Sequence, residues 1–415
     1  MEKINQVIII HYTLPPVIGG VEKMLEPLAE QLAQNNFIVT FLAGKGNLNS
    51  KKIKTSLIPE LDPEHTKIAG MQKQIDAGSI PEQFETKVDE IERKIETKIG
   101  YIKNVVIHNM MSMPHNLAAT QALWNFIQKH PDKNYYIWTH DLAWKMESYQ
   151  EHLFERRPWS LLKEPISQGH YITVSESRQN QIVDLLGISK SKIKVVPNVI
   201  KFTDFLHFHD STSQVIKQLS LYNRFPVIML PVRLLPRKNI PRAVKILSKL
   251  KDYYPDFVAI ITGDIPAKNL RAKECFERIT KIIEENQIQE NITFLDNVFK
   301  KLGIDSGKNP VIVRDLYFLS HLVLYLSSDE GFGIPILESA VARTPIVLSD
   351  IKVFKDIAGN NVNYLPAKLS DSEAAEELHE ILMEKSEYLQ LNRKVARRYN
   401  WEFWWDRYLK DIFNN

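Results

Sequence analysis

The sequence has a single cysteine, Cys275, among 415 residues. An internal disulfide framework and a cysteine-based metal cluster are therefore excluded. No uninterrupted apolar run is long enough to span a bilayer. The apolar stretch at residues 7–10 is too short for the hydrophobic region of a signal peptide. These absences predict a reducing compartment, and we expect a cytoplasmic location.

A strong charge of either sign is also absent, since 53 basic and 50 acidic residues give a net charge of +3. No motif for nucleic-acid binding is present either, so we predict no nucleic-acid partner. A local basic patch that meets the inner membrane face or an anionic acceptor is left open. The loop after the first apolar segment lacks the dinucleotide pattern Gly-x-Gly-x-x-Gly, which removes the main support for a dehydrogenase.

Short apolar segments alternate with amphipathic helical segments, as in parallel sheets built from βαβ units. The predicted strands of the first half are residues 7–11, 37–43, 105–108, 135–138, 171–174 and 193–196. Those of the second half are residues 226–232, 258–262, 292–295, 322–326 and 346–348. The length and the restart of the pattern near residue 205 predict two Rossmann-like α/β domains.

We predict an N-terminal domain over residues 1–205 and a second domain over residues 206–395, with residues 201–214 as the linker. Residues 45–100 interrupt the rhythm of the first domain and are predicted to be an insertion. Apolar residues in its second half recur at helical spacing and predict a solvated helix on the rim of the domain. Alternatively, the insertion shapes the specificity for the acceptor, as loops and insertions often do. Residues 396–415 are rich in aromatic side chains and predict a helical docking segment.

The most informative segment, residues 327–338, follows the predicted strand 322–326. Its loop contains Gly331, Phe332 and Gly333. Pro335 suits the start of a helix, where free backbone N–H groups and the helix dipole attract anions. Glu330 lies in the loop, and Glu338 falls about one turn into the helix. Two carboxylates beside a phosphate-binding turn suit a nucleotide-sugar.

Cations and glycines elsewhere complement this segment. Arg233 and Lys238 follow the predicted strand 226–232 and offer positive charge to a diphosphate; Arg237 is an alternative to either. Gly19 and Gly20 follow the first strand, where a glycine loop lets the backbone approach a ligand closely.

Polar residues also end the strands of the first half, at the edge where open α/β sheets bind ligands. His140 follows the strand 135–138 and is the candidate for contact with a sugar hydroxyl. His108 and Asn109 end another strand and are expected on the acceptor side, as is His11. The alternative interpretation of His140 is a structural histidine whose ring forms hydrogen bonds with the nearby backbone and contacts no ligand.

The segment Glu-Gly-Phe-Gly-Ile-Pro-x-x-Glu at residues 330–338, together with Arg233, Lys238 and the glycine loop, resembles the Glu-x7-Glu signature of the GT4 family of retaining GT-B glycosyltransferases. The resemblance spans nearly the whole chain except residues 45–100. It implies the GT-B fold, with two Rossmann-like domains facing across a cleft. It also implies that the last helix, in residues 396–415, crosses back to the N-terminal domain.

The resemblance implies roles for the donor-side residues. Arg233, Lys238 and the amides of the glycine loop would stabilise the diphosphate, and Glu338 would accept hydrogen bonds from the ribose. Glu330, with the amides of Phe332 and Gly333, would hold the donor sugar. His140 would contact that sugar near the reacting centre. The residues expected near the nucleotide are Gly263, Asn297 and Val298.

By resemblance, the protein is a hexosyltransferase that moves a sugar from a nucleoside diphosphate to an acceptor hydroxyl with retention of configuration. No cofactor and no metal would be required. A nucleotide-sugar epimerase and a glycoside phosphorylase are alternatives, and a non-catalytic partner-binding or chaperone subunit is an alternative of another class. The sequence identifies neither the sugar, the base, the acceptor nor the oligomeric state.

Overall fold

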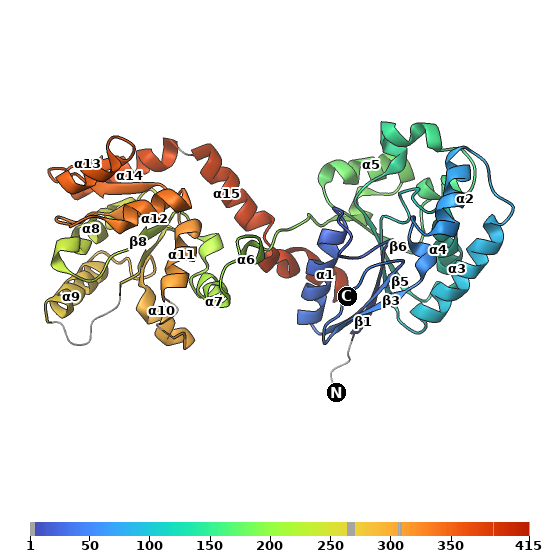
Figure 1. The fold of residues 1–415 in the computed structure, drawn as a ribbon, viewed down its shortest axis with the longest axis horizontal. Helices are drawn as coiled ribbons and strands as arrows, with labels where there is room; N and C mark the ends of the chain where they lie inside the picture. The colour runs from blue at the N-terminus through green and yellow to red at the C-terminus, as the bar shows by residue number, and fades with distance from the viewer. Residues whose placement is uncertain (1–4, 264–269, 306, 308, 385, 415) are drawn as a thin grey trace. The chain divides into compact units, whose positions relative to one another are not determined.

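A computed structural model of the chain describes residues 5–263, 270–305, 307, 309–384 and 386–414. The chain forms two compact units. The N-terminal unit comprises Met1–Val199 and Trp401–Asn415, and the C-terminal unit comprises Ile200–Asn400. Our predicted boundaries were 205/206 and 395/396. Each unit has one parallel sheet with helices packed on it (Figure 1). The predicted fold class of two Rossmann-like α/β domains, that of GT-B proteins, is confirmed.

The sheet of the N-terminal unit has the strand order β3-β2-β1-β4-β5-β6-β7 within the described residues, and all its pairs are parallel. Its strands are β1 (Asn5–Ile10), β2 (Phe37–Ala43), β3 (Ile53–Leu57), β4 (Asn104–His108), β5 (Asn134–Thr139), β6 (Gly169–Thr173) and β7 (Ile193–Val195). Its helices include α1 (Glu22–Gln34), α2 (Thr66–Asp76), α3 (Phe84–Ile99), α4 (Leu117–Lys129), α5 (Glu176–Leu186) and α16 (Lys410–Phe413). The order reverses between β1 and β4, and such a switch point is where open α/β sheets hold ligands.

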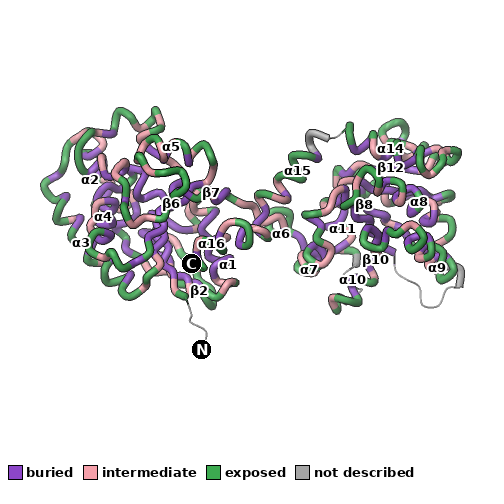
Figure 2. Tube along the Cα trace, turned by 180° about the vertical axis from the view of Figure 1, so that it is seen from behind, coloured by how far each residue is buried: buried purple, intermediate pink, exposed green. Residues whose placement is uncertain are grey.

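The two faces of this sheet pack into two different cores, because successive side chains of a strand point to opposite faces. Val7 and Ile9 of β1 pack on the side of α1, whereas Ile8 and Ile10 pack on the side of α2, α3 and α4. Figure 1 shows α1 and α4 on opposite sides of the sheet, and Figure 2 shows the central strands as buried. Both faces are covered, which explains why the strands read as continuous apolar runs.

Residues 45–100 are part of the sheet and the core, in contrast to the insertion that we predicted. β3 pairs in parallel with β2 at the sheet edge. α3 packs on α4 and buries Phe84, Val88 and Ile91. β3 itself was not predicted, because it is a short edge strand, Ile-Lys-Thr-Ser-Leu, in which polar residues stand beside apolar ones.

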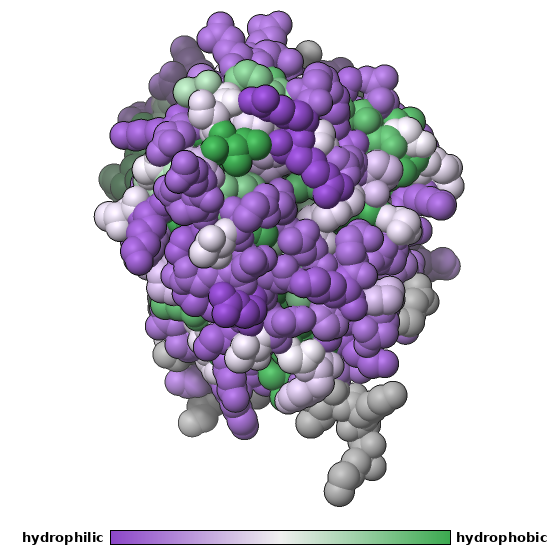
Figure 3. All heavy atoms as spheres, turned by 90° about the vertical axis from the view of Figure 1, so that its right-hand side faces the viewer, coloured by the Kyte–Doolittle hydropathy of each residue, from purple (hydrophilic) through white to green (hydrophobic). Residues whose placement is uncertain are grey.

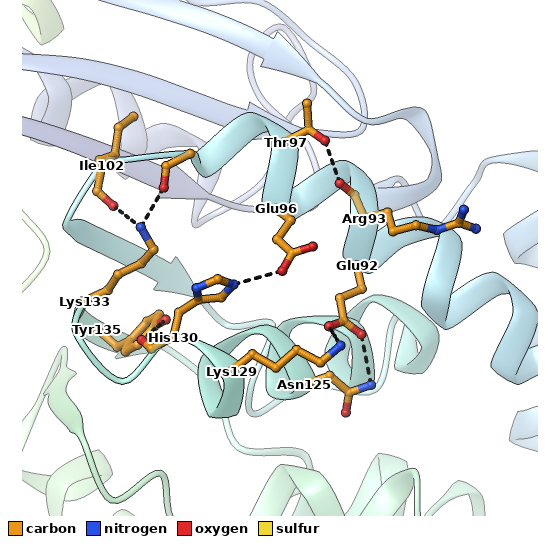
Figure 4. A network of polar contacts seen from close by, with 11 residues as sticks. Glu92, Arg93, Glu96, Thr97, Ile102, Asn125, Lys129, His130, Lys133 and Tyr135 are labelled. Atoms are coloured by element: carbon orange, nitrogen blue, oxygen red, sulfur yellow. Dashed lines mark hydrogen bonds and ion pairs between the residues drawn. The ribbon is translucent and has the colours of Figure 1, made fainter.

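Polar contacts reinforce the packing of α3 on α4 (Figure 4). The buried carboxylate of Glu92 accepts from Asn125 at 3.3 Å and forms an ion pair with Lys129. Lys133 donates to the carbonyls of Gly100 and Ile102 at 2.7 and 3.0 Å. The helix that we expected on the rim is therefore tied to the body of the unit at both its middle and its end.

The C-terminal aromatic segment packs on the α1 side of the N-terminal unit. It consists of a 3₁₀ turn (Trp401–Phe403), a π-helical turn (Trp405–Leu409) and α16. Trp404 is 1% exposed and belongs to the same core as β2. Trp401 Nε1 donates to the carbonyl of Pro27 at 3.1 Å, and Gln31 Nε2 donates to the carbonyl of Trp401 at 2.8 Å. These contacts bind the end of the chain to α1.

The sheet of the C-terminal unit has the strand order β10-β9-β8-β11-β12-β13 within the described residues and reverses between β8 and β11. Its strands are β8 (Val227–Leu230), β9 (Val258–Ile261), β10 (Ile292–Phe294), β11 (Leu322–Tyr325), β12 (Ile346–Ser349) and β13 (Asn363–Leu365). Its helices are α6 (Phe202–Phe205), α7 (Asp210–Leu219), α8 (Ile240–Leu250), α9 (Leu270–Glu285), α10 (Leu295–Leu302), α11 (Asn309–Leu319), α12 (Ile334–Ala342), α13 (Lys352–Ala358), α14 (Asp371–Glu384) and α15 (Ser386–Arg398).

The predicted linker at residues 201–214 is wrong, because this segment forms α6 and the first turns of α7. Asp315 is fully buried and accepts from the backbone N–H of His209 at 2.9 Å and from Thr212 Oγ1 at 2.5 Å. The polar residues that suggested a linker thus satisfy a buried carboxylate.

The face of the N-terminal unit shown in Figure 3 is mainly hydrophilic, and its hydrophobic side chains are scattered. Among the helices of the described residues, none is long and apolar enough to cross a membrane.

We expect Trp404→Ala to lower the free energy of unfolding of the N-terminal unit by about 3–5 kcal/mol, because it removes a large buried side chain and leaves a cavity. Urea unfolding followed by circular dichroism measures this change. Lys410→Ala, at an exposed position of the same segment, is the control and should stay near wild type. Equal stability of all three proteins would contradict this packing.

Candidate functional site

Two loops of the C-terminal unit join at the switch point between β8 and β11. The loop after β8 contains the 3₁₀ turn Pro236–Lys238, and the loop after β11 contains Glu330. Ser328 N donates to the carbonyl of Arg237 at 2.8 Å, and Arg237 Nη1 donates to the carbonyl of Asp329 at 2.9 Å. β8 and β11 are parallel neighbours, so their carboxyl ends bring these loops to one edge of the sheet.

Glu330 is the centre of this loop pair. Its side chain is 7% exposed, accepts from Arg237 Nη1 at 2.6 Å and forms an ion pair with Lys238. The Lys238 ammonium also lies 5.2 Å from the ring centre of Tyr325. Burial raises the pKa of Glu330, but hydrogen bonds from Lys238 and Arg237 outweigh it and lower the pKa to about 2. The site therefore holds one carboxylate between two cations.

Arg237, which we gave as an alternative to Arg233 or Lys238, is the cation that joins Lys238 at Glu330, and the role of Arg233 at the diphosphate stays a prediction. Arg233 is exposed, and no ion pair of its side chain is found among the described residues. Its backbone lies beside Gly263, which follows β9; Asp264, the next residue, lies outside the described residues. Sequence spacing alone could not decide between the arginines, because the 3₁₀ turn sets which side chain faces Glu330.

The loop before α12 turns into the helix at a glycine, as the sequence indicates. Gly333 is the N-cap of α12 with φ of 113°, and a Cβ there would lie 3.1 Å from carbons of Ile336 and Phe354. Only glycine suits this position. α12 begins at Ile334, one residue before Pro335, and Gly331 and Phe332 are exposed. The free N–H groups of the helix start are thus next to an open loop.

Glu338 lies on α12 and accepts a hydrogen bond from Tyr317 on α11 at 2.7 Å. Sequence analysis missed Tyr317, because nothing in its spacing relates it to Glu338. Asn297 and Val298 were expected near the nucleotide, and they lie in the first turn of α10. Asn297 is exposed, whereas the side chain of Val298 is 4% exposed. Their contact with a nucleotide stays a prediction.

In the N-terminal unit, His108 and His140 meet at the ends of β4 and β5. His108 Nδ1 lies 3.2 Å from His140 Nε2. Asn109 Oδ1 accepts from the backbone N–H groups of His140 and Asp141 at 2.7 and 3.2 Å. Burial lowers the pKa of His140 to about 3 and that of His108 well below its usual value. Both rings are therefore neutral at physiological pH.

Gly19 and Gly20 lie in the loop between β1 and α1, and Glu22 opens α1. Glu22 accepts from Thr13 Oγ1 at 2.7 Å, and its carboxylate lies 3.5 Å from His11 Nε2. Sequence analysis missed Glu22, although an acidic residue in the first helical turn after a glycine pair was a usable signal.

The chain is similar to several known proteins. Residues 212–398, less than half of the chain, match the family model for "Glycosyl transferases group 1". The O-antigen chain mannosyltransferase RfbU of Salmonella typhimurium is 24% identical over 47% of this chain and 46% of its own length. The mannosylglucosylglycerate synthase of Petrotoga mobilis is 21% identical over 70% of this chain and 73% of its own. A glycosyltransferase of known structure from Rickettsia africae covers 99% of both chains at 15% identity, with a TM-score of 0.38.

The family model thus covers most of the C-terminal unit, and the two curated relatives are named as a mannosyltransferase and a mannosylglucosylglycerate synthase. The chain spans less than half the length of the Salmonella relative. Among the described side chains, no group of three or more His, Cys, Asp or Glu residues is arranged to hold a metal ion.

The ion pairs of Glu330 predict a pH-dependent contribution to stability. Its pKa in the folded protein is about 2, below the ordinary 4.5, so its stabilisation is complete above about pH 5 and is lost as the pH falls toward 2. We expect Glu330→Gln to be less stable than wild type at pH 6, with a difference that shrinks steadily toward pH 2.5. Urea unfolding across this range measures it.

Glu377→Gln removes an exposed glutamate of α14 and serves as the control, with no pH-dependent difference from wild type. A Glu330→Gln difference that is constant from pH 6 to pH 2.5 would show that the ion pairs do not stabilise the fold.

Proposed function

We propose that the protein is a retaining glycosyltransferase that moves a hexose from a nucleoside diphosphate sugar to an acceptor hydroxyl. The observation that carries this proposal is the shared position of Glu330 between Lys238 and Arg237. Fixed cations stabilise a diphosphate leaving group, and a carboxylate accepts hydrogen bonds from the hydroxyls of a sugar. Both are present in one loop pair, within the unit that matches the family model.

Donor binding would exchange the partners of this cluster. Lys238 and Arg237 would release Glu330 and bind the diphosphate oxygens. Glu330 would then accept hydrogen bonds from the donor sugar. Because the ammonium and guanidinium already face one another across a carboxylate, little rearrangement of the two loops is needed. Glu338, oriented by Tyr317, would accept from the ribose hydroxyls.

The transfer itself would break the bond between the anomeric carbon and the diphosphate oxygen and form a bond to the acceptor oxygen on the same face. The acceptor proton would pass to the departing phosphate oxygen, so that no protein base is required. The neutral His140 would donate or accept a hydrogen bond at the sugar without adding charge. No cofactor or metal enters this scheme, and a peripheral contact with a membrane and a cytoplasmic location stay predictions.

The names of the relatives suggest which donor sugar to test first. The Salmonella and Petrotoga proteins are named for mannosyl transfer and mannosylglucosylglycerate synthesis. We therefore propose mannose as the first hexose to test, with UDP-, GDP- and ADP-linked sugars compared by thermal shift and by nucleotide release with saccharide, lipid and small-solute acceptors. Release that depends on an acceptor favours transfer; epimerised donor or sugar phosphate would favour the epimerase or the phosphorylase.

Replacement of Glu338 and replacement of Glu330 should change different kinetic constants. We expect Glu338→Ala to raise the donor KM about tenfold with little change in kcat, because it removes ground-state hydrogen bonds. Glu330→Ala should lower kcat about 100-fold or more, because the sugar loses its anchor in the transition state. Steady-state nucleotide release measures both, with Glu377→Ala as the control. Wild-type constants in both variants would contradict the assignment.

A further inference from the structure

The C-terminal unit contains a cavity of about 750 Å³ that the proposed mechanism does not use. It is lined by Ser320 and His321, which precede β11, and by Pro345, which precedes β12. Glu330, in contrast, follows β11. The four residues of β11 span about 13 Å. The cavity therefore lies at the amino edge of the sheet, whereas the candidate donor site lies at the carboxyl edge.

The walls of this cavity are mostly apolar and come from four helices. α6 contributes Phe202 and Phe205, α11 contributes Phe318, α12 contributes Val341, and α15 contributes Leu389. Phe205, Phe318 and Val341 are 70%, 49% and 82% exposed. Large apolar side chains that stay this open around a cavity of this volume are typical of a site for a molecule with an apolar body.

The charged residues of the lining are three arginines, Arg224, Arg343 and Arg393. Among the described residues that line the cavity, none carries a carboxylate. In the described part of the chain, no ion pair of these three arginines is found. Arg224 Nη2 donates to the carbonyl of Phe257 at 2.9 Å, and the Arg393 guanidinium lies 5.2 Å from the ring centre of Phe225. These contacts hold two of the side chains but do not neutralise their charges.

The neighbouring titratable groups leave this positive charge in place. His321 Nδ1 accepts from the backbone N–H of Val227 at 3.0 Å, so this nitrogen carries no proton. Burial lowers the pKa of His321 to about 4, and the ring is neutral at physiological pH. Asp204, next to Phe205 in α6, pairs with Lys201 at 3.0 Å. The charge of the cavity therefore comes from guanidinium groups, which stay protonated.

We propose that this cavity binds one amphipathic anion, a molecule with an apolar chain and a carboxylate or phosphate group. The chain would pack against Phe205, Phe318 and Val341, and the anionic group would bind Arg343 and Arg393. An inorganic anion would leave the apolar walls uncovered, and a neutral chain would leave the arginines without a counter-charge. The inference concerns the C-terminal unit alone and does not depend on the proposed function.

Isothermal titration calorimetry with decyl phosphate, below the concentration at which it forms micelles, tests this proposal. We expect the wild-type protein to bind one molecule per chain. Decanol lacks the anionic group and inorganic phosphate lacks the chain, so each should bind at least about tenfold more weakly. Equal affinity for decanol or for inorganic phosphate, or several equivalent sites per chain, would overturn the proposal.

Variants of the lining locate the bound molecule. Arg343→Asn removes one cation and introduces a residue that tolerates the observed φ of 58°. We expect it to bind decyl phosphate about tenfold more weakly, and the double variant with Arg393→Gln to bind more weakly still. Phe318→Ser should weaken the binding of decyl phosphate and leave that of inorganic phosphate unchanged. Arg278→Gln, at an exposed position of α9 outside the cavity, is the matched control and should bind like wild type.

Three further results would overturn the proposal. A loss of affinity in Arg278→Gln as large as in Arg343→Asn would indicate a general effect of surface charge. Displacement of decyl phosphate by guanosine diphosphate would place the probe at the candidate donor site. Binding of the protein to phosphatidylglycerol vesicles, without binding of decyl phosphate, would indicate contact with a membrane surface. Circular dichroism of each variant checks that its fold is that of wild type.

Discussion

Both units depend on the same constraint, the reversal of strand order at one point of a parallel sheet. At such a point two neighbouring strands send their connections in opposite directions, and their carboxyl ends are left open. In the C-terminal unit this brings the loops after β8 and β11 together around Glu330. In the N-terminal unit it brings the ends of β1 and β4 together around His11. Both of these groups of side chains therefore lie where the topology opens the sheet.

The two clusters solve one electrostatic problem in different ways. Each keeps a carboxylate ionised in a poorly solvated place, because hydrogen bonds lower the pKa of Glu330 and that of Glu22 to about 2. Glu330 has two permanent cations as partners, Lys238 and Arg237. Glu22 accepts from Thr13 Oγ1 at 2.7 Å, and its carboxylate lies 3.5 Å from His11 Nε2. A ligand with a diphosphate and hydroxyls fits the first cluster through exchange of partners.

Much of the fold could be predicted from the sequence, because strands that are buried on both faces form apolar runs. β2 was predicted with its observed bounds, and β8, β9 and β11 within a few residues. The short edge strands β3 and β13 were missed, since edge positions tolerate polar residues. Residues 201–214 were misread as a linker because their polar side chains serve the buried Asp315. Local composition does not reveal such long-range partners.

The motifs of the candidate site could be predicted from the sequence, but the contacts between its side chains could not. The segment at residues 330–338 has the expected loop and helix, and Lys238 lies beside Glu330. The choice of Arg237 over Arg233 and the partnership of Glu338 with Tyr317 depend on side-chain directions that spacing does not fix. The position of Asn297 and Val298 in the first turn of α10 was not predicted, because a strand is followed here directly by that helix.

The most direct measurement is a crystal structure of the protein with a nucleoside diphosphate sugar bound. We predict that Lys238 and Arg237 leave Glu330 for the diphosphate oxygens, while Glu330 accepts hydrogen bonds from the sugar. A donor bound elsewhere, with the ion pairs of Glu330 intact, would contradict the account.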